Sequence, residues 1–156
     1  MTEIDMQPER PANFTLNNDK CFVCGTKNPF GLQVDLEIAE AGASVRIECT
    51  PPDHLQGWAD ILHGGILSTL LDEAITYIGI GTFDQHAVTA QLEVHFRNPA
   101  PTGVKLFVSA ERIKVSKRLV EAKAEVTLGD GTLIATGTGK VVPVSENFAP
   151  KVPDTP

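Results

Sequence analysis

The spacing of hydrophobic residues along the chain changes from the alternation of β-strands to the period of an α-helix and then back to alternation. This order limits the folds that the chain can form. Residues 64–80 repeat apolar residues with the period of an α-helix, and Gly79 and Gly81 are expected to end that helix. The runs on both sides alternate apolar and polar residues as half-buried strands do, at 32–38, 43–49, 87–97, 104–115, 119–128 and 133–144. The predicted order is therefore β-β-α-β-β-β-β.

Short connections join the predicted strands. An Ala-Gly turn separates the first two runs, a polar Ser-Lys-Arg turn follows residue 115, and Gly129-Asp130-Gly131 is a strong hairpin signal. Links of this length imply an antiparallel sheet. We therefore predict an α+β fold in which a curved antiparallel sheet wraps around one long central helix and both apolar faces are buried.

Length and composition indicate one soluble globular domain. The chain has 156 residues, of which 42% are hydrophobic and 21% charged. A net charge of -7 argues against a nucleic-acid partner, because phosphate-binding proteins usually carry a basic surplus. The first ten residues, MTEIDMQPER, lack the apolar region of a secretory signal, and no apolar run approaches the roughly 20 residues that cross a membrane. We expect a cytoplasmic protein with no membrane partner.

The two ends differ in composition from the middle of the chain. Residues 1–20 are polar and contain two prolines, and residues 145–156 contain three. We expect a flexible arm at 1–20, the folded domain at 21–144, and a flexible tail at 145–156.

The polar half of the predicted helix contains no cation. It carries Ser68, Thr69, Asp72, Glu73 and Thr76, and no Lys or Arg occurs between residues 59 and 81. A solvated helix face usually mixes Glu with Lys, although such a face remains the simpler interpretation. The composition favours a partly covered surface, for example a subunit interface.

Two glycines stand in the first turn of this helix, directly after His63. The backbone N–H groups of a first turn lack helical partners, and without a Cβ at Gly64 and Gly65 a ligand can approach them closely. This arrangement is typical of an oxyanion site. The alternative is that the glycines only allow close packing.

The spacing between His63 and Asp72 sets a geometric limit. Nine residues of helix place them roughly 13.5 Å apart along the axis and about 180° around it. One small reacting group therefore cannot touch the helix N-terminus and Asp72 of the same helix. If the two cooperate, they belong to two chains with antiparallel helices, in a homodimer.

The motif HGGILSTLLDEA, supported by VTAQLEVHFRNPAPTG and AEVTLGDGTLIATGTGK, resembles the hotdog-fold acyl-CoA thioesterases of the phenylacetyl-CoA thioesterase-like (PaaI-like) family. The resemblance covers about residues 21–144. It implies the hotdog fold and hydrolysis of an acyl-CoA thioester to free coenzyme A and a carboxylic acid. It also implies no cofactor, and a homodimer or a dimer of dimers (a homotetramer).

The resemblance also implies roles for individual residues. The Gly64 N–H would polarise the thioester carbonyl, with His63 and Gly65 shaping that site. Asp72 of the other subunit would activate water or attack directly, and a carboxylate suits either role. Thr89 would orient water or the thiolate, although it could equally be an ordinary strand threonine.

Further positions carry weaker expectations for substrate binding. Many relatives have an Asn six residues before the His, where this chain has Gly57, so the neighbouring Gln56 could supply the amide. Glu73 points about 100° away from Asp72 and is expected at an interface or core edge. Three cations could bind the phosphates of coenzyme A, namely Arg97, Lys117 and Arg118. The alternative is that they are only solvated surface charges.

The cysteines raise the question of a metal site. Three cysteines are too few for a disulfide framework, and the C-x-x-C of CFVCG is half of a tetrahedral zinc site. Two copies of the chain could complete a four-cysteine site. We expect reduced structural cysteines and no bound metal, with zinc as the alternative.

Two other functions compete with the thioesterase. A non-catalytic acyl-CoA binding or sensing module could use the same fold, but Asp72 favours an enzyme. Hydratase chemistry would need a His and an Asp at one carbon, and His63 and Asp72 lie on opposite sides of one helix.

Overall fold

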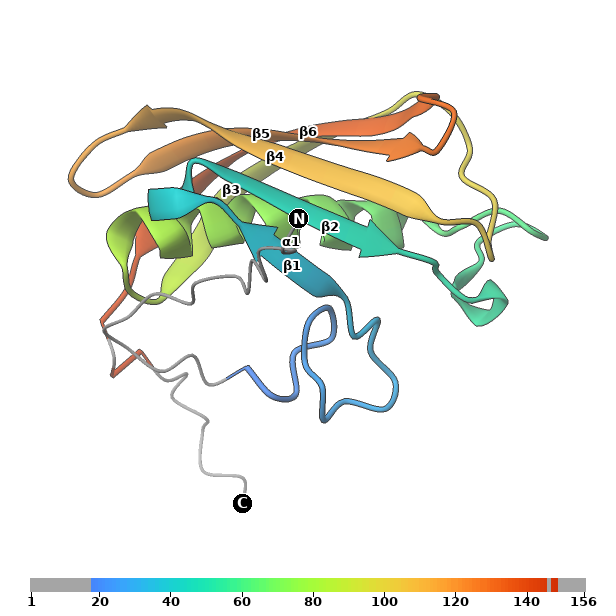
Figure 1. The fold of residues 1–156 in the computed structure, drawn as a ribbon, viewed down its shortest axis with the longest axis horizontal. Coiled ribbons are helices and arrows are strands. Elements are labelled where there is room, and N and C mark those ends of the chain that lie inside the picture. The colour runs from blue at the N-terminus through green and yellow to red at the C-terminus, as the bar shows by residue number, and fades with distance from the viewer. Residues whose placement is uncertain (1–17, 146, 149–156) are drawn as a thin grey trace, which may run out of the picture.

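The computed structural model describes residues 18–145 and 147–148. It contains one α-helix, two short 3₁₀ helices and six strands within this part of the chain (Figure 1). In chain order they are β1 (Asp35–Ile38), η1 (Glu40–Gly42), β2 (Ser44–Cys49), η2 (Asp53–Leu55), α1 (Gly64–Phe83), β3 (Ala87–Phe96), β4 (Leu106–Val115), β5 (Val120–Leu128) and β6 (Leu133–Pro143). The order β-β-α-β-β-β-β is confirmed.

The strands form one antiparallel sheet in the order β1-β2-β4-β5-β6-β3. This sheet arches over α1, which lies along its concave side (Figure 1). The predicted α+β fold with a wrapped central helix is confirmed. Because β3 lies at one end of the strand order, its outer edge pairs with no strand of the described chain.

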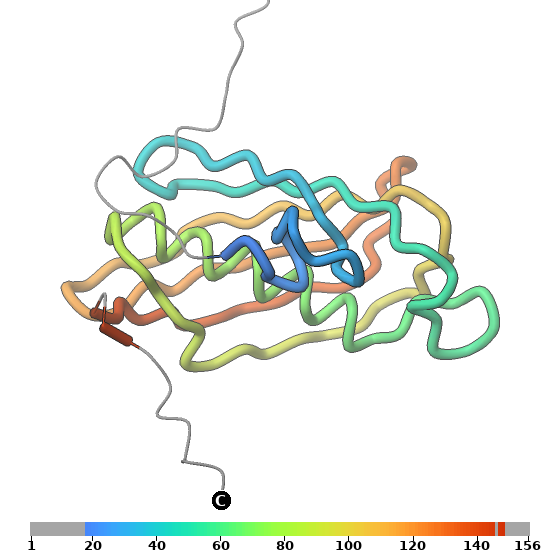
Figure 2. Tube along the Cα trace, turned by 90° about the horizontal axis from the view of Figure 1, so that it is seen from below, coloured from blue at the N-terminus to red at the C-terminus, as the bar shows by residue number. Residues whose placement is uncertain are grey.

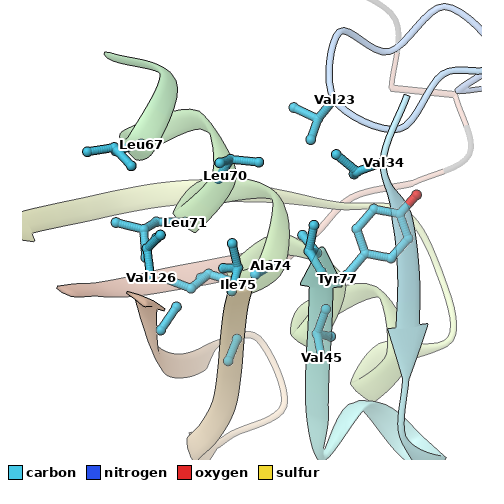
Figure 3. Packing of buried hydrophobic residues seen from close by; sticks show 14 of the residues in the cluster. Val23, Val34, Val45, Leu67, Leu70, Leu71, Ala74, Ile75, Tyr77 and Val126 are labelled. Carbon is cyan, nitrogen blue, oxygen red and sulfur yellow. The ribbon is translucent and has the colours of Figure 1, made fainter. Parts of the chain in front are cut away.

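The apolar side of α1 forms the centre of the core. The helical period places seven apolar residues on one side of α1, and all except the half-buried Ile66 are fully or nearly fully buried (Figure 3). The buried six are Leu67, Leu70, Leu71, Ala74, Ile75 and Ile78. A small strand residue lets the helix approach, since a Cβ at Gly139 of β6 would lie only 2.8 Å from Ile75. Burial of these side chains stabilises the fold by roughly 1.5–3 kcal/mol for each large one.

The helix continues past both glycines that were expected to end it, so that prediction is wrong. It runs to Phe83, and Asp84 ends it in the left-handed conformation at φ 52°. The glycines serve close packing instead. A Cβ at Gly79 would lie 2.3 Å from Val141 of β6, and one at Gly81 would lie 2.7 Å from the Gly42 backbone.

The first strand is shorter than predicted. It begins at Asp35 instead of Leu32, because residues 32–34 bond to the segment before them. The N–H groups of Leu32 and Val34 donate to the carbonyls of Phe22 and Val23, at 2.7 and 2.9 Å. Val23 and Val34 thereby join the buried cluster beside α1 (Figure 3).

Most of the predicted arm and tail lie outside the described residues. Residues 18–34 run across the side of α1 that faces away from the sheet (Figure 2). By length and composition α1 could span a membrane. Its apolar side, however, is occupied by the sheet, as in the core helix of a soluble protein.

Candidate active site

His63 caps the N-terminus of α1 and uses one of the two glycine amides to do so. Its Nδ1 accepts a hydrogen bond from the Gly65 N–H at 2.8 Å, and its carbonyl accepts from the Ile66 N–H at 2.9 Å. The N–H of Gly64 has no acceptor within the described chain. Gly64 therefore presents a donor without a partner in the described chain, at the end of α1 where the helix dipole favours negative charge.

The loop before the helix holds His63 in place. The His63 N–H donates to the Leu55 carbonyl at 3.0 Å, and the Asp60 N–H donates to Gln56 Oε1 at 3.0 Å. A Cβ at Gly57 would lie 3.4 Å from His63 Cα. Gln56 thus lies beside the helix N-terminus, with its amide oxygen bonded to the loop.

An aromatic ring that the sequence analysis did not single out lies beside Gly64. A Cβ built on Gly64 would be 3.3 Å from two ring carbons of Phe96, the last residue of β3. The Phe96 side chain is 57% exposed, so it stands over the free amide without being fixed in the core. The sequence feature that could have identified this residue is a phenylalanine near the end of the predicted strand 87–97.

Asp72 lies about two and a half turns further along α1. It is half-buried and makes no hydrogen bond or ion pair within the described residues. Thr76 is one turn onward, and its Oγ1 lies 2.8 Å from the Oγ1 of Thr89 in β3. Thr89 therefore lies on the same side of the helix as Asp72. The sequence analysis assigned Thr76 no role in the site, although its position four residues after Asp72 could have placed it beside that carboxylate.

The site residues thus form two groups separated along one helix. The first comprises His63, Gly64 and Gly65 with Gln56 in the preceding loop, and the second comprises Asp72 with Thr89. Both Asp72 and the Gly64 amide are available to a ligand, but roughly 13.5 Å of helix keeps them apart in one chain.

Glu73 faces different neighbours from those of Asp72. The Cys21 thiol lies 3.8 and 4.0 Å from its two carboxylate oxygens. Cys24 belongs to the same cluster, and its Sγ is 3.4 Å from the hydroxyl of Tyr77. Part of the cation-free helix face is therefore covered by the chain's own amino-terminal segment.

Burial sets the ionisation of this cluster. Burial, followed by the neighbouring Glu73, raises the pKa of the Cys24 thiol to about 12. Burial and the charge of Asp72 raise the pKa of Glu73, and hydrogen bonds from the two thiols partly oppose that rise. Burial also raises the pKa of Cys49, in β2, to about 11. Both neutral thiols are therefore poor nucleophiles at neutral pH.

The three candidate phosphate-binding cations lie at opposite ends of the sheet. Arg97 follows β3, and its N–H donates to the Ile134 carbonyl at the end near the start of α1. Lys117 and Arg118 are exposed in the turn between β4 and β5, near the end of α1. One chain does not bring them together.

Comparison with known proteins shows similarity to thioesterases and esterases. A model described as "Thioesterase superfamily" matches residues 59–135, which include α1, His63 and Thr89 but not Gln56. An Archaeoglobus fulgidus protein described as a "Putative esterase" is 27% identical over 142 residues, which are 91% of this chain and 86% of that protein.

Two solved structures have the same fold. The Escherichia coli PaaI protein from the phenylacetic acid degradation operon superimposes with a TM-score of 0.67 at 21% identity, covering 73% of this chain and 81% of that chain. A Streptococcus mutans UA159 protein bound to acetyl CoA superimposes with a TM-score of 0.65 at 19% identity, covering 72% and 89%. The superfamily match and the Archaeoglobus fulgidus relative support a thioesterase or esterase activity in general. The chain therefore has the hotdog fold, which it shares with PaaI, and its residues 59–135 are similar to the thioesterase superfamily.

Proposed function

We propose that the chain is an acyl-CoA thioesterase whose active site is shared between two copies. The observation that carries this proposal is the free Gly64 amide at one end of α1 and the unpaired Asp72 carboxylate far along the same helix. Antiparallel helices across a twofold axis would bring the Gly64 amide of one copy to Asp72 of the other.

In this proposal the first group of residues activates the carbonyl. The thioester oxygen accepts from the Gly64 N–H, which stabilises the negative charge that develops during attack. His63 fixes the Gly65 amide, so that the first turn keeps its shape without offering a second donor in the same place. Gln56 stiffens the loop beside this site through its bond to the Asp60 N–H.

The second group supplies the attacking oxygen. Asp72 either removes a proton from a water molecule that attacks the carbonyl carbon, or attacks that carbon itself. The first route expels the thiolate directly, and the second forms a mixed anhydride that water then hydrolyses, so both routes give a carboxylic acid and a thiol. Thr89, paired with Thr76, stands where a hydroxyl would orient the water or the departing thiolate.

The choice of coenzyme A as the thiol is supported by the fold relatives. The Streptococcus mutans protein is bound to acetyl CoA, and a Streptococcus pneumoniae relative was solved with coenzyme A. In the proposed dimer, Lys117 and Arg118 of one copy would lie toward the Gly64 end of the other, on the same side as its Arg97. Those three cations would then face the phosphates together.

Thiol release from a panel of acyl-CoA thioesters tests the proposal. The panel contains short, medium and long alkyl chains and an aromatic acyl group, and a thiol-reactive dye reports free coenzyme A. We expect turnover with at least one thioester. Tight binding of a non-hydrolysable acyl-CoA analogue without turnover of any thioester would instead favour the second function, a non-catalytic acyl-CoA binding module.

A further inference from the structure

The amino-terminal segment brings two cysteine thiols to the same side of a tight turn. The Gly25 N–H donates to the Cys21 carbonyl at 3.0 Å, and the Val23 N–H donates to Cys21 Sγ at 3.4 Å. Gly25 has no room for a side chain, because a Cβ there would lie 2.4 Å from the Cys21 nitrogen. A backbone N–H that donates to a sulfur is an outer-shell contact of the kind that orients metal ligands.

This turn lies against α1 at Glu73, so that three ligand atoms converge. Cys21 Sγ, Cys24 Sγ and a Glu73 carboxylate oxygen all lie within 4.8 Å of one another. In a tetrahedral zinc site with zinc–sulfur bonds of about 2.3 Å and zinc–oxygen bonds of about 2.0–2.2 Å, neighbouring sulfur and oxygen ligands are roughly 3.5–3.7 Å apart. The contact between Cys21 Sγ and the nearer Glu73 oxygen, at 3.8 Å, is already close to this separation.

The cluster has no basic side chain beside it within the described residues. No hydrogen bond or ion pair between residues 18 and 145 brings a Lys or Arg to Cys21, Cys24 or Glu73. Their polar neighbours are Tyr77 and Asn18, whose amide donates to the Tyr77 hydroxyl at 2.8 Å. A bound divalent cation would convert both thiols to thiolates, and thiolate ligands select zinc over magnesium or calcium.

We propose that Cys21, Cys24 and Glu73 form a zinc-binding site that fastens residues 18–34 onto the outer side of α1. Water completes the tetrahedron. Zinc displaces the thiol protons on binding, so each bound ion releases protons to solvent. The site lies one residue from Asp72 in sequence but on a different side of the helix, and it gives Glu73 a structural role beyond the substrate contact expected from sequence.

Cobalt titration of the full chain, reduced with a thiol-free phosphine, tests this site. Tetrahedral cobalt bound to thiolates gives visible d–d bands and a near-ultraviolet charge-transfer band, and zinc should displace it. We expect one cobalt per chain in wild type and in Cys49→Ser, the matched control, whose thiol is buried in β2. Cys21→Ser, Cys24→Ser and Glu73→Gln should each bind at least about tenfold more weakly.

Two further measurements keep the test independent of folding defects. Zinc should raise the melting temperature of wild type and Cys49→Ser but not of the three ligand variants, each first checked for native circular dichroism. Zinc should also protect Cys21 and Cys24 from alkylation. Absence of micromolar cobalt binding by wild type, or equal affinity in Glu73→Gln, would overturn the proposal.

Discussion

Asp72 and Glu73 are adjacent in α1, but their surroundings give them different chemistry. Asp72 is half-buried and has no hydrogen-bonded partner among the described residues, and Glu73 contacts the thiol of Cys21. Replacement of Asp72 by Asn keeps the shape and removes the charge, so turnover should fall by at least about 10²-fold, the lower range of a general-base contribution. Glu73→Gln should reduce turnover less. Steady-state kinetics on the two purified variants decides the assignment, and the reverse order would make it wrong.

Gly64 is expected to act through its backbone, so a side chain is harmful there only by obstruction. Gly64→Ala keeps the N–H and should leave stability unchanged or raise it by up to about 1 kcal/mol. The methyl would occupy the place of the thioester oxygen, and turnover should fall on the order of 10²-fold. Melting temperature and turnover measured on one preparation check both parts.

The Phe96 ring provides the control for this variant. The new methyl would lie 3.3 Å from that ring, which is exposed enough to move aside. If the activity were lost because the displaced ring blocks the site, removing that ring in the double variant Gly64→Ala/Phe96→Ala would restore it. If the new methyl itself obstructs the Gly64 amide, the double variant stays inactive. Lower stability with full activity per folded molecule would identify Gly64 as a packing glycine.

The helix α1 uses glycine for two different purposes along its length. Near its end, a Cβ at Gly79 would overlap Val141 of β6, and both positions are fully enclosed by the sheet. Gly79→Ala should therefore destabilise the fold by about 1–3 kcal/mol, the usual cost of overpacking a core, despite the better helix propensity of alanine. Denaturant midpoints of this variant and of Gly64→Ala should shift in opposite directions, or Gly64→Ala should not shift at all. Equal shifts would show that local helix propensity dominates at both sites.

The whole molecule is predicted to be a dimer, since its two groups of site residues do not meet in one chain. The free outer edge of β3 is where two sheets would join or abut. A solution mass of two chains, or of four for a dimer of dimers, is expected at micromolar concentration. The mass of a single chain would contradict the shared site. The cytoplasmic location expected from sequence stays a prediction.

Mixing two inactive variants tests the shared site directly. In a heterodimer of Asp72→Asn and Gly64→Ala, one site carries both defects and the other carries neither. Random reassortment of equal amounts should therefore restore about a quarter of wild-type turnover, because half the dimers are mixed and half their sites are intact. If both residues acted within one chain, every site would be defective and no activity would return.

Local pattern by itself determined the element order, the wrapped helix and the separation of the two site groups. Strand and helix periods repeat over neighbouring residues, and the helical rise between His63 and Asp72 follows from counting residues. The HGG motif and the acid pair could therefore be found without coordinates.

Only the tertiary structure decided which distant residues meet. Glu73 contacts Cys21 across 52 positions of sequence, Gly79 remains helical because Val141 needs its space, and Phe96 stands over Gly64. These contacts depend on how the chain returns on itself, and the period of a single element carries no information about that path. The proposed zinc ligands, unlike the proposed catalytic residues, were therefore visible only after the amino-terminal segment was placed on α1.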